Sequence, residues 1–170
     1  MSEEPGSDTY PSGLPRPHVE ALAARPEILI ITGMSGAGRS KAADVVADLG
    51  WYVVDNLPPS MLVEMVGVVA REGYGRLAAV LDARGGRLFA DLRAVLDDLS
   101  SSGPAPRVVF LEASDQALVK RFEEVRRPHL LQGDGTLLEG IQKERVALAE
   151  VKERADVVID TSETTIPEFS

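Results

Sequence analysis

Eight consecutive residues, Gly33 to Ser40, have the types and the spacing of a loop that binds phosphate. Their sequence, Gly-Met-Ser-Gly-Ala-Gly-Arg-Ser, matches the pattern G-x-x-x-x-G-K-[S/T] except at Arg39, where arginine replaces lysine. Glycines let main-chain amides turn inward around phosphate oxygens, and the amino terminus of the following helix adds favourable partial positive charge. The residues expected to bind the phosphates of ATP or GTP are Gly33, Met34, Ser35, Gly36, Ala37, Gly38, Arg39 and Ser40.

Arg39 and Ser40 stand where such loops place a cation and a hydroxyl group. The cation faces the β- and γ-phosphates, and the hydroxyl of Ser40 is placed to hold Mg²⁺. Arginine keeps the positive charge of the usual lysine but presents a wide planar fork instead of a compact ammonium group. Lys41 is a poor substitute because the next residue of a helix points about 100° away. We therefore expect binding of nucleotide with Mg²⁺ and slow hydrolysis.

Short apolar segments that alternate with helical patterns surround this loop. Residues 28–31 form a β-branched and aliphatic run that is typical of a strand buried on both faces. Similar runs recur, and apolar residues at helical spacing follow each of the first four. Their ranges are 51–54, 77–81, 108–111 and 157–159, with a long last helix over roughly 137–155. The pattern predicts an α/β fold, with a parallel five-stranded sheet and helices on both faces, of the P-loop NTPase or kinase type.

Acidic residues at the carboxyl ends of the predicted strands are the candidates for catalysis. Ligands of parallel sheets lie at these ends, close to the point where the strand order reverses. Asp82 ends the third strand and is a candidate ligand of Mg²⁺ together with Ser40; its alternative role is to start the turn before Gly85. Asp55 ends the second strand and is a candidate to orient water, metal or an acceptor substrate; its alternative role is to cap the next helix.

Arginines complete the set of candidate residues. Arg84 follows the third strand closely, and it is a candidate either to bind phosphate or to pair with a carboxylate. Arg126 and Arg127 end a predicted helix before a segment that contains glycine. They are candidates for a lid over the phosphates, although a favourable interaction with the helix dipole explains them almost as well.

Composition divides the chain and excludes several classes of protein. Residues 1–26 are an acidic arm rich in proline, which we expect to be disordered, and residues 27–170 form the nucleotide-binding domain. The net charge of −9 opposes broad nucleic-acid binding. The chain has no cysteine, no secretory signal and no apolar run long enough to cross a membrane. These features predict a cytoplasmic protein without a membrane partner.

Three alternatives remain open at this point. A dinucleotide-binding fold also places an acidic residue such as Asp55 after its second strand, but Lys41 would then stand where a small residue must allow close helix packing. A small-molecule kinase would use Asp55 toward the acceptor and the segment of Arg126 and Arg127 as a lid. A non-catalytic interaction module would keep the loop without affinity for nucleotide.

Longer motifs resemble the RapZ/YvcJ family of bacterial nucleotide-binding proteins, which includes ribonuclease adapters. The most specific is DLGWYVVDNLPP, from Asp48 to Pro59. The resemblance runs from about Ile28 to the end of the chain. Its further matches are the segments 82–84, 126–129 and 155–162.

The resemblance implies an ATP site at Gly33–Ser40 and weak ATPase and GTPase activity. It also implies a regulatory role, in RNA metabolism or in the control of cell-envelope precursors. A second, GTP-associated motif falls on Asp82, Ala83, Arg84 and Gly85. Family members continue into a carboxy-terminal domain, which we expect to be absent here and to carry contacts with a protein partner or a second copy. RNA recognition is attributed to that domain, so we expect none by residues 27–170 alone.

Overall fold

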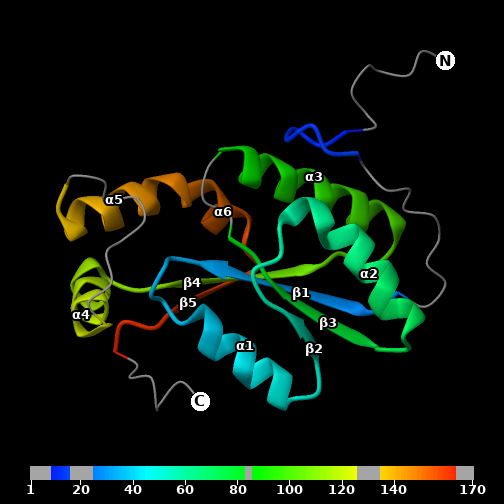
Figure 1. Cartoon of the computed structure of the whole chain (residues 1–170), viewed down its shortest axis with the longest axis horizontal. Helices are drawn as coiled ribbons and strands as arrows, with labels where there is room; N and C mark the ends of the chain where they lie inside the picture. The colour runs from blue at the N-terminus through cyan, green and yellow to red at the C-terminus, as the bar shows by residue number, and fades with distance from the viewer. Residues whose placement is uncertain (1–8, 16–24, 83–85, 126–134, 164–170) are drawn as a thin grey trace.

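A parallel sheet of five strands forms the centre of the protein (Figure 1). The computed structural model describes residues 9–15, 25–82, 86–125 and 135–163. The strand order is β2-β3-β1-β4-β5, so that β3 and β4 flank β1 while β2 and β5 form the two edges of the sheet. The strands are β1 (Glu27–Gly33), β2 (Tyr52–Val54), β3 (Arg76–Val80), β4 (Arg107–Glu112) and β5 (Val157–Asp160). This order places the end of β1 at the point where the direction of winding changes.

Helices cover both faces of the sheet (Figure 1). One face carries α1, and α2, α3, α5 and α6 lie on the other side, while α4 packs next to α5. The helices are α1 (Arg39–Asp48), η1 (Pro59–Met61), α2 (Leu62–Arg71), α3 (Gly86–Ser102), α4 (Asp115–Val125), α5 (Leu137–Ala147) and α6 (Ala149–Arg154). The predicted α/β fold with helices on both faces of a parallel sheet is therefore confirmed. No helix within the described ranges is both long and apolar enough to cross a membrane.

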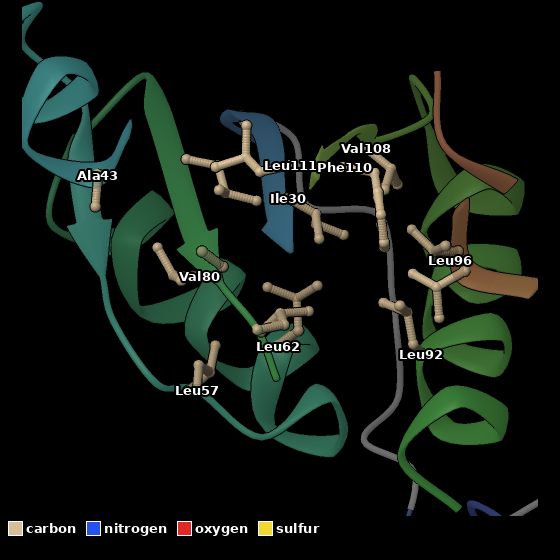
Figure 2. Close-up of a cluster of buried hydrophobic side chains, with 14 of the residues drawn as sticks. Ile30, Ala43, Leu57, Leu62, Val80, Leu92, Leu96, Val108, Phe110 and Leu111 are labelled. Carbon is tan, nitrogen blue, oxygen red and sulfur yellow. The ribbon is translucent and has the colours of Figure 1, made fainter. Parts of the chain in front are cut away.

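The apolar run of β1 forms the middle of the core. Ile30 is fully buried between β3 and β4, and its β-branched side chain suits the pleated surface of a buried strand. On one side of the sheet, Leu92 and Leu96 of α3 point toward Val108 and Phe110 of β4 (Figure 2). Each such large side chain contributes roughly 1.5–3 kcal/mol when it leaves water. The core thus fixes the strand that leads into the turn before α1.

Two local features differ from the sequence-based expectation. The single helix expected over 137–155 is divided at Leu148, which ends α5 and precedes α6 with a backbone outside regular helix geometry. Within the arm, Tyr10 is buried and the amide of Ser12 donates a 3.1 Å hydrogen bond to a carboxylate oxygen of Asp91. The composition of the arm does not predict this contact.

Candidate functional site

The turn between β1 and α1 begins with a glycine that touches the neighbouring strand. Gly33 has a φ of 145°, and a Cβ atom built on it would lie 2.1 Å from the carbonyl oxygen of Leu111 in β4. The amide of Met34 donates a 2.9 Å hydrogen bond to the same oxygen. Only glycine allows this close approach, which anchors the start of the turn to the sheet.

Two further glycines give the turn its curvature. Gly36 and Gly38 have left-handed φ angles of 83° and 108°, and the amide of Ala37 donates a 3.1 Å hydrogen bond to the carbonyl of Met34. Gly38 precedes the first residue of α1, and no side chain caps this helix. The first amides of a helix have no partner inside the helix. A tight turn therefore leads directly into an uncapped helix amino terminus.

Two carbonyl groups of the turn accept hydrogen bonds from distant parts of the chain. Arg121 of α4 donates a 3.1 Å hydrogen bond to the carbonyl of Gly36, and the hydroxyl of Thr161 donates a 2.7 Å hydrogen bond to the carbonyl of Ala37. Arg121 also donates to the carbonyl and the hydroxyl of Thr161. In Figure 1 the turn accordingly lies next to α4 and to the chain that follows β5. The carbonyls of Gly36 and Ala37 are therefore occupied by α4 and by the residue that follows β5.

The amides at the helix end of the turn have no acceptor in the described part of the chain. None of the hydrogen bonds found there uses the amides of Gly36, Gly38, Arg39 or Ser40. Successive amides that converge beside a helix amino terminus favour the binding of an anion, because the helix dipole adds partial positive charge. The geometry at Gly36–Ser40 is thus that of an anion-binding cup.

Arg39 and Ser40 are both available at this cup. Arg39 is half-buried and Ser40 is exposed, and neither side chain forms a hydrogen bond or ion pair with the residues whose positions are described. The structure places a guanidinium group and a hydroxyl group at the start of α1, and their roles at phosphate and metal stay predictions. They supply a cation and an oxygen donor beside the amides.

The strand end of the turn has a different environment, because a carboxylate from α5 reaches it. The amide of Ser35 donates a 2.7 Å hydrogen bond to Glu144 Oε1, and the hydroxyl of Ser35 donates a 2.6 Å hydrogen bond to Glu144 Oε2. Glu144 is completely buried. The part of the turn nearest to β1 therefore already holds a carboxylate, whereas the part nearest to α1 does not.

The two acidic candidates, Asp82 and Asp55, lie at different distances from the turn. Ile31 pairs with Val80, and the amide of Leu81 donates to the carbonyl of Ile31, so Asp82 is level with Gly33 at the start of the turn. Asp55 follows β2, one strand further from β1, and its side chain is exposed. Two strand spacings amount to about 10 Å. Of these two carboxylates, Asp82 is the one beside the turn.

The remaining candidates from the sequence lie outside the described residues. They are Ala83, Arg84 and Gly85 of the segment after β3, and Arg126 and Arg127 after α4. Their predicted roles at the phosphates stay predictions.

The oxygen donors beside the turn fit a magnesium ion that arrives with a nucleotide. Mg²⁺ takes oxygen ligands, and in nucleotide sites one or two protein groups combine with phosphate oxygens and water. Ser40 and Asp82 offer a hydroxyl and a carboxylate at this end of the sheet. Among the described residues there is no cluster of three or more metal-ligating side chains. This donor set suits an ion held jointly by protein and phosphate.

Asp160, at the end of β5, carries a perturbed carboxyl group next to Thr161. Hydrogen bonds from the hydroxyl and the amide of Ser162 lower the pKa of Asp160. The hydroxyl of Ser162 in turn accepts a 2.7 Å hydrogen bond from the amide of Ser114, which follows β4. These bonds join the ends of β4 and β5 beside the turn.

Sequence reasoning did not single out three residues that the fold brings to the turn. Arg121 has no spacing in the sequence that indicates a role at the turn, and Thr161 belongs only to the longer motif at 155–162. Glu144 carried a readable signal, since it lies at helical spacing between the buried residues Ile141 and Leu148. A charged residue within such an apolar stripe indicates a specific buried partner.

Comparisons with known proteins agree with this architecture. The family model described as the RapZ-like N-terminal domain matches residues 26–170. A nucleotide-binding protein of Clavibacter michiganensis subsp. michiganensis is 54% identical over 146 residues, which are 85% of this chain and 50% of that protein. A nucleotide-binding protein of Streptomyces coelicolor is 55% identical over 149 residues, which are 86% of this chain and 50% of that protein. The chain thus spans about half the length of these curated relatives.

A solved structure extends the comparison to the fold. The shikimate kinase from Acinetobacter baumannii, in complex with shikimate, superposes with a TM-score of 0.55 at 15% sequence identity. The match covers 84% of this chain and 88% of that chain. At this identity the likeness concerns the fold alone, which is the P-loop kinase type that the sequence predicts.

Proposed function

This chain belongs to the RapZ-like N-terminal domain family, and from that premise we propose that it binds the phosphates of ATP and GTP, with Mg²⁺, in the turn between β1 and α1. The observation that carries the proposal is the orientation of this turn. The carbonyls of Gly36 and Ala37 are engaged by Arg121 and Thr161, while the amides at the start of α1 face no protein acceptor in the described ranges. The names of the two relatives, both nucleotide-binding proteins, support the same assignment.

Individual residues take distinct roles in this proposal. Arg39 contacts the β- and γ-phosphates, and Ser40 and Asp82 hold Mg²⁺ together with phosphate oxygens. The guanidinium group of Arg39 neutralises phosphate charge, but its planar fork does not reproduce the compact contact of a lysine. Binding is therefore expected to be firm and hydrolysis of ATP and GTP slow.

Slow hydrolysis favours a regulatory role over metabolic turnover. A domain that hydrolyses its nucleotide slowly keeps that nucleotide bound for long periods. The bound nucleotide can change the conformation of another part of a protein, provided that it binds the two conformations with different free energies. We place that regulatory role in a longer protein such as the relatives named above. The segment 82–85 and the arginines 126 and 127 make additional contacts to the phosphates in this proposal.

The experiment that tests the proposal measures equilibrium binding of Mg·ATP and Mg·GTP by calorimetry. Arg39→Ala is expected to weaken binding by about tenfold or more, because charge-assisted contacts to phosphate are among the stronger hydrogen bonds. Arg107→Ala is the matched control, since it removes the same charge from the exposed first residue of β4. This residue lies at the amino-terminal end of its strand, whereas the turn lies at the carboxyl end of β1. Release of inorganic phosphate from ATP and GTP is expected to be slow.

Two outcomes would contradict the proposal. One is the absence of binding of either nucleotide to the wild-type chain. The other is equal affinity of the Arg39→Ala and Arg107→Ala variants, which would remove the turn from the binding site.

A further inference from the structure

We infer that Glu144 is a specificity-determining residue, which occupies the place of the third phosphate and makes the loop favour nucleoside diphosphates over triphosphates. This inference rests on the proposed function, because it assigns a selectivity to the same turn. It starts from the contact between Glu144 of α5 and Ser35, two residues that are 109 positions apart.

The contact has the form of an anion bound by the loop. Both carboxylate oxygens of Glu144 are engaged, one by the main-chain amide of Ser35 at 2.7 Å and one by its hydroxyl at 2.6 Å. Short distances of this kind are typical of hydrogen bonds to an ionised acceptor. A carboxylate that accepts from an amide and a hydroxyl of the same loop residue makes the contacts that two phosphate oxygens would make there.

The position of Glu144 in α5 makes a purely space-filling role a poor explanation. Glu144 lies three residues after Ile141 and four before Leu148, both of which are buried in the core. An apolar side chain at this position would continue the stripe, whereas a buried carboxylate costs free energy unless it is bound by polar groups. The contact with Ser35 offsets part of this cost.

The order of the amides along the turn assigns the phosphate that Glu144 replaces. In phosphate loops the amides cradle the α- and β-phosphates, and the cation reaches the β- and γ-phosphates. Among the described residues, the amides of this turn that have no acceptor are that of Gly36 and, at its helix end, those of Gly38, Arg39 and Ser40. Ser35 lies at the strand end, where the third phosphate remains to be placed. A diphosphate can therefore bind beside Glu144, but a triphosphate competes with it for Ser35.

Electrostatic repulsion and the anchoring of α5 strengthen this competition. Two negative charges that lie close together repel one another, so a third phosphate beside the carboxylate binds less favourably than it would without it. Arg145, the neighbour of Glu144, donates a 2.8 Å hydrogen bond to Asp115 Oδ1 and a 2.7 Å hydrogen bond to the carbonyl of Ala113. These bonds hold α5 against α4 and the end of β4, so the carboxylate is presented to the loop whenever the domain is folded.

The test compares the affinities of the same chain for Mg·ADP and Mg·ATP, and for Mg·GDP and Mg·GTP, by calorimetry. Glu144→Gln keeps the size of the side chain and an acceptor for the amide of Ser35 but removes the charge. It is expected to raise triphosphate affinity relative to diphosphate affinity by about tenfold or more, a ratio that corresponds to roughly 1.4 kcal/mol. Ser35→Ala removes one of the two bonds and is expected to act in the same direction with a smaller effect.

Glu153→Gln is the matched control, since it removes one negative charge from an exposed position of α6. It is expected to leave the ratio of the two affinities unchanged. Melting temperatures of all variants, measured without nucleotide, identify any loss of folding, and Ser35→Ala provides the same comparison if Glu144→Gln fails to fold.

The outcomes separate this inference from the function on which it rests. If Glu144→Gln changes diphosphate and triphosphate affinity equally, or lowers triphosphate affinity, Glu144 only supports the loop and the inference is wrong, although Arg39-dependent binding still stands. If neither wild type nor Glu144→Gln binds any nucleotide, both proposals are wrong.

Discussion

The hydroxyl of Thr161 donates a 2.7 Å hydrogen bond to the carbonyl of Ala37, which lies 124 residues earlier in the chain. Thr161 is 2% exposed, and its own amide donates a 2.8 Å hydrogen bond to the carbonyl of Glu112. One residue therefore connects the turn between β1 and α1 to the end of β4 and to the last strand. This connection keeps a loop carbonyl away from the side on which the amides converge.

Replacing the hydroxyl of Thr161 is expected to weaken phosphate binding. Thr161→Val keeps the shape of the side chain but leaves the carbonyl of Ala37 without its donor, which costs about 1–3 kcal/mol when such a group is buried. We expect a lower melting temperature and a several-fold weaker affinity for Mg·ATP. Thr161→Ser keeps the hydroxyl and is expected to bind like the wild type. Equal affinities of the Val and Ser variants would contradict the role of this bond.

Adding a methyl group at Gly33 is expected to destabilise the whole domain. The new Cβ would lie 2.1 Å from the carbonyl oxygen of Leu111, so either β1 or β4 must move. Gly33→Ala is expected to lower the free energy of unfolding by about 3 kcal/mol, at the upper end of overpacking effects. Gly73→Ala is the control, because Gly73 also has a left-handed φ, of 85°, but has open space around it. Urea unfolding should show a clearly larger loss for Gly33→Ala than for Gly73→Ala.

Removing the hydroxyl of Ser40 is expected to reduce the gain in ATP affinity that Mg²⁺ provides. Ser40→Ala should lower the affinity for ATP in the presence of Mg²⁺ by about tenfold, since a ligand of the ion is lost. In the presence of a chelator, the affinity for ATP should remain that of the wild type. Ser40→Thr retains the oxygen donor and serves as the control. A loss of affinity that is equal with and without Mg²⁺ would assign Ser40 to the phosphates instead of the metal.

Asp160 is expected to make stability depend on pH in the acidic range. Its pKa is lowered in the folded protein, chiefly by the hydrogen bond from the hydroxyl of Ser162, so folding favours the ionised form. The stabilisation is complete above the unfolded value of about 3.9 and is lost as the pH falls below it toward the lowered folded value. Asp160→Asn should therefore melt below the wild type at pH 7, and the difference should shrink below pH 4. Asp44→Asn, which removes one negative charge from an exposed position of α1, is the control variant.

The sequence predicts the parts of this protein that depend on local chemistry. The run from Ile28 to Ile31 and the glycines that follow it specify a buried strand and a turn, because β-branched packing and left-handed φ angles are local requirements. The spacing of Arg39 and Ser40 at the start of a helix is equally local. The same is true of Asp82, whose place at the end of a strand brings it to the edge where the turn lies.

The contacts that complete the site depend instead on the order of the strands. Arg121 and Gly36 are 85 residues apart, and they meet only because β4 lies next to β1 and α4 follows it. No spacing in the sequence specifies that neighbourhood. Glu144 is an intermediate case, since its place within an apolar stripe indicates a buried partner but does not identify Ser35 as that partner.

The position of Thr161 gives the domain two different boundaries. All five strands are complete at Asp160, so a chain shortened to that residue would still contain every element of the sheet. The side chain that tethers the carbonyl of Ala37 would be missing, however, together with the acceptor that holds Arg121 beside it. The residue that tethers the turn thus lies one position beyond the last residue of the sheet.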